Sequence, residues 1–185
     1  MTIPNLLTIV RILLTPLLVI LLLDDRLSAA LVVFVVAGVT DGLDGLIARL
    51  YKQKSRLGAF LDPMADKLLL VTTYVILAFR HLVPNWLTVI VLSRDVFIVM
   101  GVFVLFMQDL PLEIRPSLPS KLTTCSQIVT AIVAMATALA APHPLFKKVL
   151  FQITATLTII SGGQYMVRGV RILHKEGNNQ GRDRL

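Results

Sequence analysis

The sequence contains few charged residues and almost no cysteine. Only 16% of its 185 residues are charged, whereas 56% are hydrophobic and the mean hydropathy is +0.80. This composition excludes intrinsic disorder and disfavours a water-soluble domain. The single cysteine, Cys125, excludes a secreted domain held together by internal disulfides. No basic helix or aromatic–basic stripe stands outside the apolar runs, so we expect no nucleic-acid partner.

Apolar runs divide the chain, and a helix that crosses a bilayer needs about 20 such residues. Extending each run to its polar neighbours predicts helices near 7–23, 28–50, 59–79, 85–107, 121–141 and 147–173. Because the connections are short, we expect an all-α integral membrane bundle of six transmembrane helices, with a short N-terminal interfacial helix, forming a single domain over 1–185. We interpret the first run as a span rather than a signal peptide, because further apolar runs follow it.

The net charge of +7 is distributed unevenly between the connections. Arg26, Arg80, Lys147 and Lys148 fall on one side of the predicted bundle. Most of the other Lys and Arg residues, including those of the 50–58 connection, fall on the opposite side, against anionic membrane lipids. The positive-inside rule then places both termini in the cytoplasm. We therefore expect a protein of a bacterial inner membrane with its active site on the cytoplasmic side.

Four aspartates stand close together where apolar helices are predicted. Asp41 and Asp44 are three residues apart, and Asp62 and Asp66 are four apart, so each pair shares one helix face. The short connection favours antiparallel neighbouring helices, which would bring all four carboxylates together. Ionised carboxylates repel one another at low dielectric, and an all-oxygen ligand set favours Mg²⁺ or Mn²⁺. Four carboxylates carry enough charge for two divalent ions, which suits displacement at phosphorus.

Residues suited to phosphate binding surround these aspartates: small residues that allow close approach to the backbone, cations, and a glycine just before the next predicted helix. They are Gly45, Ala48, Arg49, Lys52, Lys54, Arg56 and Gly58. Carboxylates for metal beside cations for phosphate predict a diphosphate-bearing substrate, and the membrane location predicts a lipid. The alternative is that the aspartates only pair with Arg49 and Lys67 to fix helix contacts, which four clustered charges within a membrane make costly.

The aspartates and their neighbours form the motif Asp41-x2-Asp44-Gly45-x2-Ala48-Arg49-x8-Gly58-x3-Asp62-x3-Asp66. This pattern resembles the motif of the CDP-alcohol phosphatidyltransferase family without a departure. The segment Ile3-Pro4-Asn5-x2-Thr8-x2-Arg11 is similar to the amino-terminal surface helix of the same family. The resemblance implies a membrane enzyme that transfers the phosphatidyl group of CDP-diacylglycerol to an alcohol and releases CMP. It also implies a homodimer.

The same resemblance assigns roles to individual residues. Asp41, Asp44 and Asp62 would hold one divalent ion. Asp41, Asp62 and Asp66 would hold the second, and Asp66 would also be the general base. The CDP-diacylglycerol site would comprise Asn5, Thr8, Asp44, Gly45, Ala48, Arg49, Ser55 and Gly58. Asp66 would be a weak base beside a metal, so positioning and charge stabilisation would contribute more than basicity.

Two cations later in the chain are candidates for binding the acceptor. Arg94 lies within the fourth predicted helix and Lys121 begins the fifth, so either could bind a phosphate. Lys121-x2-Thr124-x2-Gln127 resembles the phosphatidylglycerophosphate synthase branch of the family, which implies glycerol 3-phosphate as the acceptor. This is our main prediction for the reaction.

Two neighbouring residues depart from that branch. Asp95 stands where Glu is usual, and Ser120 stands where Gly is usual. Ser93-Arg94-Asp95 and Ser120-Lys121 instead resemble cardiolipin synthases of the CDP-alcohol type, whose acceptor is phosphatidylglycerol. Both acceptors present a glycerol-phosphate unit, so this remains the alternative prediction.

Other classes of membrane protein also place carboxylates within spans. A divalent-cation or proton transporter predicts acidic residues along a pathway through the bundle, ideally in two inverted halves. Here they cluster at one end beside a basic connection, and the sequence has no inverted repeat. An intramembrane aspartyl protease needs two facing aspartates and no phosphate-binding cations, so four aspartates at metal-ligand spacing fit it poorly.

Overall fold

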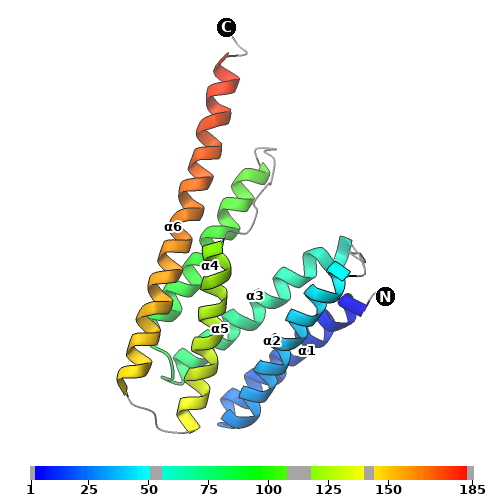
Figure 1. Ribbon diagram of the computed structural model, residues 1–185, viewed down its shortest axis with the longest axis vertical. Helices are drawn as coiled ribbons and strands as arrows, with labels where there is room; N and C mark the ends of the chain where they lie inside the picture. The colour runs from blue at the N-terminus through cyan, green and yellow to red at the C-terminus, as the bar shows by residue number, and fades with distance from the viewer. Residues whose placement is uncertain (1–2, 51–55, 108–117, 140–143, 183–185) are drawn as a thin grey trace. The chain divides into compact units, whose positions relative to one another are not determined.

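The computed structural model describes the backbone of residues 3–50, 56–107, 118–139 and 144–182, and the side chains of residues 9–40, 67–101, 119–139 and 145–167. Over the described backbone, helices are the only regular secondary structure (Figure 1). They are α1 (Ile3–Leu23), α2 (Leu27–Leu50), α3 (Arg56–Phe79), α4 (Asn85–Met107), α5 (Leu118–Leu139) and α6 (Pro144–Arg182). The prediction of an all-α fold with six helices is confirmed.

Two helix boundaries differ from the predicted ones by more than three residues, the start of the first helix and the end of the last. The N-terminal interfacial helix is not a separate element in the described residues, because α1 runs unbroken from Ile3 to Leu23 with Pro16 inside it. At the other end, α6 continues to Arg182, nine residues beyond the predicted end at 173. Hydropathy marks where apolar residues stop, whereas backbone hydrogen bonding continues through a polar sequence.

The helices expose apolar side chains over long stretches. Among the described residues, Pro119–Leu139 and Leu145–Val167 are long and apolar enough to cross a membrane, with 33% and 28% of their most apolar windows buried. Shorter apolar stretches occur at Ile9–Leu23, Leu27–Thr40 and Lys67–Phe79. Such low burial is expected of a membrane protein, whose apolar faces contact lipid. The count of six transmembrane spans remains a prediction.

The chain divides into two compact units. The first comprises Met1–Asn85 and Ile128–Lys147, and the second comprises Trp86–Gln127 and Lys148–Leu185. In the first unit α1 packs against both α2 and α3, and these helices lie side by side in Figure 1. Its core is built from large apolar side chains with almost no exposed surface, namely Leu18, Leu22, Phe34, Tyr74 and Leu77.

Helices α1 and α3 each end, at the lower side of Figure 1, in a turn of the same type. Asp25 and His81 follow the two helices with φ of 63° and 56°, in the left-handed region. The next amide in each case donates back to the helix, from Arg26 to the Leu21 carbonyl and from Leu82 to the Leu77 carbonyl. This is the Schellman arrangement, which satisfies the last carbonyl groups of a helix.

Arg80 links these two helix ends. Its guanidinium donates to the Leu22 and Leu23 carbonyls of α1 and forms an ion pair with Asp25. A cation at the carboxyl end of a helix is favourable because the last carbonyls carry partial negative charge. Arg80 therefore fixes the end of α3 to the end of α1.

The second unit contains α4, the first part of α5 and most of α6. The α5–α6 contact is polar. The Thr123 hydroxyl lies 2.9 Å from the Pro119 carbonyl of its own helix and 3.0 Å from the Leu157 carbonyl of α6. The Gln127 amide donates to the Thr158 hydroxyl at 3.3 Å. Buried hydroxyl and amide groups of this kind hold helices together where no water can satisfy them.

Candidate functional site

The motif aspartates lie on two helices of the first unit. Asp41 and Asp44 are in the last part of α2, and Asp62 and Asp66 are in the first half of α3. Residues 51–55 connect these two helices, and α1 packs against both of them. The helical spacing that the sequence predicted is therefore present in the backbone. The aspartate side chains lie outside the described residues, and their convergence remains a prediction.

The other residues assigned to CDP-diacylglycerol lie outside the described side chains as well. Helices α1, α2 and α3 contain seven of these positions in their backbones, and Ser55 falls in the connection that is not described. The seven are Asn5, Thr8, Asp44, Gly45, Ala48, Arg49 and Gly58.

The donor chemistry of the aspartates fits a divalent metal. Four carboxylates at i, i+3 and i, i+4 spacing on two helices of one unit supply hard oxygen ligands, which Mg²⁺ and Mn²⁺ prefer. Among the described side chains, no group of three or more His, Cys, Asp or Glu residues could hold a metal ion. The motif thus remains the candidate metal site of this chain.

Arg11 is a buried cation on α1 whose importance the sequence analysis did not anticipate. Its side chain has no exposed surface, although it lies on the helix that packs against both motif helices. A fully buried guanidinium is rare because its desolvation must be offset by polar or charged partners. The available signal was a single charge within the first apolar run, which was used only as part of the amino-terminal motif.

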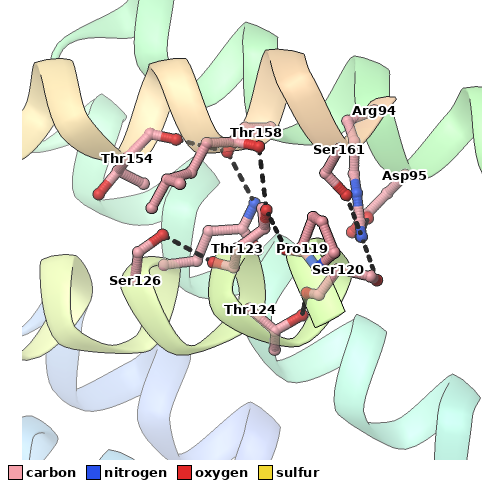
Figure 2. A network of polar contacts seen from close by, with 12 residues as sticks. Arg94, Asp95, Pro119, Ser120, Thr123, Thr124, Ser126, Thr154, Thr158 and Ser161 are labelled. Carbon is pink, nitrogen blue, oxygen red and sulfur yellow. Dashed lines mark hydrogen bonds and ion pairs between the residues drawn. The ribbon is translucent and has the colours of Figure 1, made fainter. Parts of the chain in front are cut away.

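Arg94 is the centre of a polar cluster in the second unit. Its side chain is 6% exposed, and Nη1 donates to the Asp95 carboxylate at 2.7 Å. Nη2 donates to the Ser120 hydroxyl of α5 at 2.8 Å and to the Ser161 hydroxyl of α6 at 3.3 Å. Figure 2 shows the guanidinium reaching from α4 to both serines, with Asp95 beside it. Three helices therefore hold one cation in place.

Two further residues border this cation on α6. The Tyr165 ring centroid lies 5.9 Å from the Arg94 Cζ, within the range of a cation–π contact. Gly162 faces the aliphatic part of the side chain, since a Cβ placed there would meet Arg94 Cγ at 3.5 Å. The Arg94 Nε is buried and has no hydrogen-bond partner among the described residues. The cluster thus neutralises the cation but leaves one of its donors unused.

The two predicted acceptor residues differ in burial and in their described contacts. Arg94 lies in the buried cluster, whereas Lys121 is exposed and forms none of the hydrogen bonds around Arg94 in the described part of the chain. Ser161 and Tyr165 were not predicted as site residues. Both lie in the apolar stretch Leu145–Val167 of α6, where no charge or motif marked them in the sequence.

Comparison with known proteins identifies the chain. Residues 1–160 match the family model of CDP-alcohol phosphatidyltransferase. The chain belongs to the CDP-alcohol phosphatidyltransferase family. The match covers the aspartate motif of the first unit and reaches into α6, so the predicted family is confirmed on a region much longer than the motif.

Several relatives in the CDP-alcohol phosphatidyltransferase family carry the same name. "Cardiolipin synthase (CMP-forming)" of Rattus norvegicus is 37% identical over 185 aligned positions, which cover 89% of this chain and 60% of the relative. The protein of that name from Homo sapiens is 36% identical with the same coverage. The Streptomyces coelicolor protein of that name is 39% identical over 111 positions, covering 57% of this chain and 52% of the relative. This chain spans about 60% of the length of the mammalian relatives.

These names bear on the choice of acceptor. The main prediction, a phosphatidylglycerophosphate synthase acting on glycerol 3-phosphate, is less well supported than its alternative, a cardiolipin synthase. Asp95 and Ser120 depart from the pattern of the phosphatidylglycerophosphate synthase branch, and they are also the two nearest hydrogen-bond partners of Arg94. The pattern Lys121-x2-Thr124-x2-Gln127 favoured the other branch, and the names of the relatives support it less well.

Proposed function

We propose that this protein transfers the phosphatidyl group of CDP-diacylglycerol to phosphatidylglycerol, giving cardiolipin and CMP. Family membership supports the transfer, and the names of the relatives support the acceptor. The observation that carries the choice is the Arg94 cluster, in which Asp95 and Ser120 both contact the guanidinium. A phosphodiester acceptor carries one negative charge, which suits a buried cation that a carboxylate already neutralises in part.

The reaction exchanges one bond at phosphorus for another. The terminal hydroxyl oxygen of phosphatidylglycerol forms a bond to the phosphatidyl phosphorus, and the bond from that phosphorus to the oxygen of CMP breaks. Asp66 accepts the hydroxyl proton at its carboxylate. Two divalent ions, Mg²⁺ or Mn²⁺, would supply charge stabilisation to the diphosphate. Asp41, Asp44 and Asp62 would hold the first, and Asp41, Asp62 and Asp66 the second.

The other predicted residues bind and orient the two lipids. The CDP part would be held by Asn5, Thr8, Asp44, Gly45, Ala48, Arg49, Ser55 and Gly58. Arg94 would bind the acceptor phosphate, and we retain Lys121 as a second acceptor cation that attracts the head group from an exposed position. We also propose a homodimer, as the family resemblance implies, in a bacterial inner membrane. The loop charges predict that the termini and the aspartates lie on its cytoplasmic side.

The test is an acceptor panel with the full chain in lipid nanodiscs. CDP-diacylglycerol and Mn²⁺ or Mg²⁺ are combined in turn with phosphatidylglycerol, glycerol 3-phosphate, inositol phosphate and serine, and both CMP and the lipid product are measured. We expect CMP and cardiolipin with phosphatidylglycerol, and neither for Asp66→Asn or with chelator. Cation flux into sealed proteoliposomes without CMP release would support a transporter. A product only with glycerol 3-phosphate would overturn the proposed acceptor.

A further inference from the structure

The described hydrogen bonds of Arg94 leave one of its three guanidinium nitrogens, Nε, without a partner. A guanidinium has five N–H groups in a rigid plane. Nη1 donates to Asp95, and Nη2 donates to Ser120 and to Ser161. The Nε–H has no partner among the described residues, although the Arg94 residue is only 5% exposed. A buried donor without a partner costs free energy unless a ligand satisfies it.

The free donor belongs to the edge of the guanidinium that binds oxyanions. Nε–H and one Nη2–H point in nearly the same direction, and together they form the fork that holds two oxygens of one carboxylate or phosphate. In this protein, serine hydroxyls already occupy Nη2. One half of the fork, Nη2, is therefore used, and the Nε–H remains to donate to one oxygen of a bound anion.

Ser120 makes the shorter of the two serine contacts, 2.8 Å against 3.3 Å for Ser161. It is the third residue of α5, within the first turn, where backbone N–H groups lack partners inside the helix. Helix starts favour anions for this reason. The open Nε–H and the helix start thus independently indicate that an anion binds beside Ser120.

We propose that Ser120 is a positioning residue that makes the site select a phosphodiester acceptor over a phosphomonoester. The proposal rests on the proposed function. By accepting from Nη2, Ser120 leaves only the Nε–H available on the Nε/Nη2 edge of Arg94, which is enough for one oxygen of a singly charged phosphodiester. A phosphomonoester carries nearly two charges and needs the complete fork. The adjacent Asp95 carboxylate adds repulsion that the second charge feels more strongly.

Substitutions at Ser120 test this selection in the full chain. Ser120→Ala removes the hydroxyl and frees an Nη2–H, so we expect the ratio of kcat/KM for glycerol 3-phosphate to that for phosphatidylglycerol to rise about tenfold. The change should appear mainly in the KM of the acceptor, with the KM of CDP-diacylglycerol unchanged. Ser120→Thr keeps a hydroxyl and should keep the original ratio.

Ser126→Ala is the matched control, because Ser126 lies on the same helix and its hydroxyl donates only to the Thr123 carbonyl at 2.8 Å. It should leave both acceptors unaffected. If Ser120→Ala lowers the use of both acceptors equally, or leaves the ratio unchanged in active protein, Ser120 does not select the acceptor. An inactive but folded wild-type protein, by contrast, would refute the proposed function itself. Ser161→Ala should shift the ratio in the same direction, by less.

Discussion

Arg80 and Arg94 each join separate helices through a guanidinium, but they differ in how their donors are used. Arg80 closes the α1–α3 end of the first unit, and it contacts two carbonyls and an exposed carboxylate. Arg94 lies in the second unit, where it is buried among a carboxylate, two hydroxyls and an aromatic ring, with Nε unused. Arg80 satisfies backbone carbonyls at the end of α1 that would otherwise lack partners, whereas Arg94 keeps an N–H donor without a partner among the described residues.

This difference is what we expect between a structural cation and the acceptor-binding cation that we propose Arg94 to be. The carbonyls that Arg80 contacts belong to a helix end, where a cation is favourable whatever the protein does. The environment of Arg94 is costly, because the cation is desolvated and still not fully hydrogen-bonded. Such a cost is understandable where substrate binding completes the hydrogen bonds. Substituting the two residues should therefore affect different measurements.

The largest effect is expected from Arg94→Ala. Removing this buried cation should lower kcat/KM for phosphatidylglycerol by roughly a hundredfold or more, because truncation of a buried charged partner costs about 2–5 kcal/mol. The KM for CDP-diacylglycerol should change little. CMP release at varied concentrations of each lipid measures both quantities.

Arg94→Lys tests the same role if the alanine variant fails to fold. It keeps the charge but loses the planar fork, so we expect a folded protein with about a tenfold rise in the KM of the acceptor. Equal losses toward both lipids in a folded Arg94→Lys protein would contradict a role in acceptor binding and would make Arg94 structural, like Arg80.

The next effect is on stability and comes from Arg80→Ala. The variant leaves the last carbonyls of α1 without their cation, so we expect the free energy of unfolding to fall by about 1–2 kcal/mol. Loss of the ion pair adds little to this figure, because the exposed Asp25 carboxylate is solvated in either case. Unfolding in nanodiscs can be followed through Trp86, the single tryptophan. Turnover per folded molecule should stay at the wild-type value, and a selective loss of acceptor use would break the distinction between the arginines.

The smallest effect is a gain in stability from His81→Gly. His81 has a φ of 56°, which a residue with a Cβ adopts at a cost and glycine does not. We expect stabilisation by up to about 1 kcal/mol with unchanged turnover. Asp25→Gly relieves the same strain but removes the ion pair of Arg80, so it should gain less. A destabilised His81→Gly protein would show that the imidazole makes a contact that stabilises this turn.

The sequence predicted those features that depend on the spacing of residues within a single helix. The spacing of Asp41 and Asp44, or of Asp62 and Asp66, follows the helical period, so the motif could be recognised without coordinates. The helices were predicted for the same reason, since apolar runs of this length are typical of membrane spans. Their ends were less predictable, because hydrogen bonding rather than hydropathy decides where α6 stops.

The Arg94 cluster shows where such reasoning stops. Ser120 and Ser161 are 26 and 67 residues away from Arg94 in the sequence, on two other helices. No period links them, so their contact with one guanidinium depends on how the helices pack. Lys121 begins the same helix and was noticed because a cation stands out in an apolar sequence. Its role in acceptor binding stays a prediction, whereas the described contacts around Arg94 include the serine beside it.

Helix α5 contacts its neighbours in the second unit at more than one turn. Thr123 and Gln127 form hydrogen bonds to α6, and Ser120 contacts Arg94 of α4. Ser120 precedes Gln127 by seven residues, about 10 Å of helix. Adding or deleting a single residue between them would turn Ser120 by about 100° around the helix axis and away from the Arg94 guanidinium. The length of this segment is therefore as much a part of the Arg94 cluster as the serine itself.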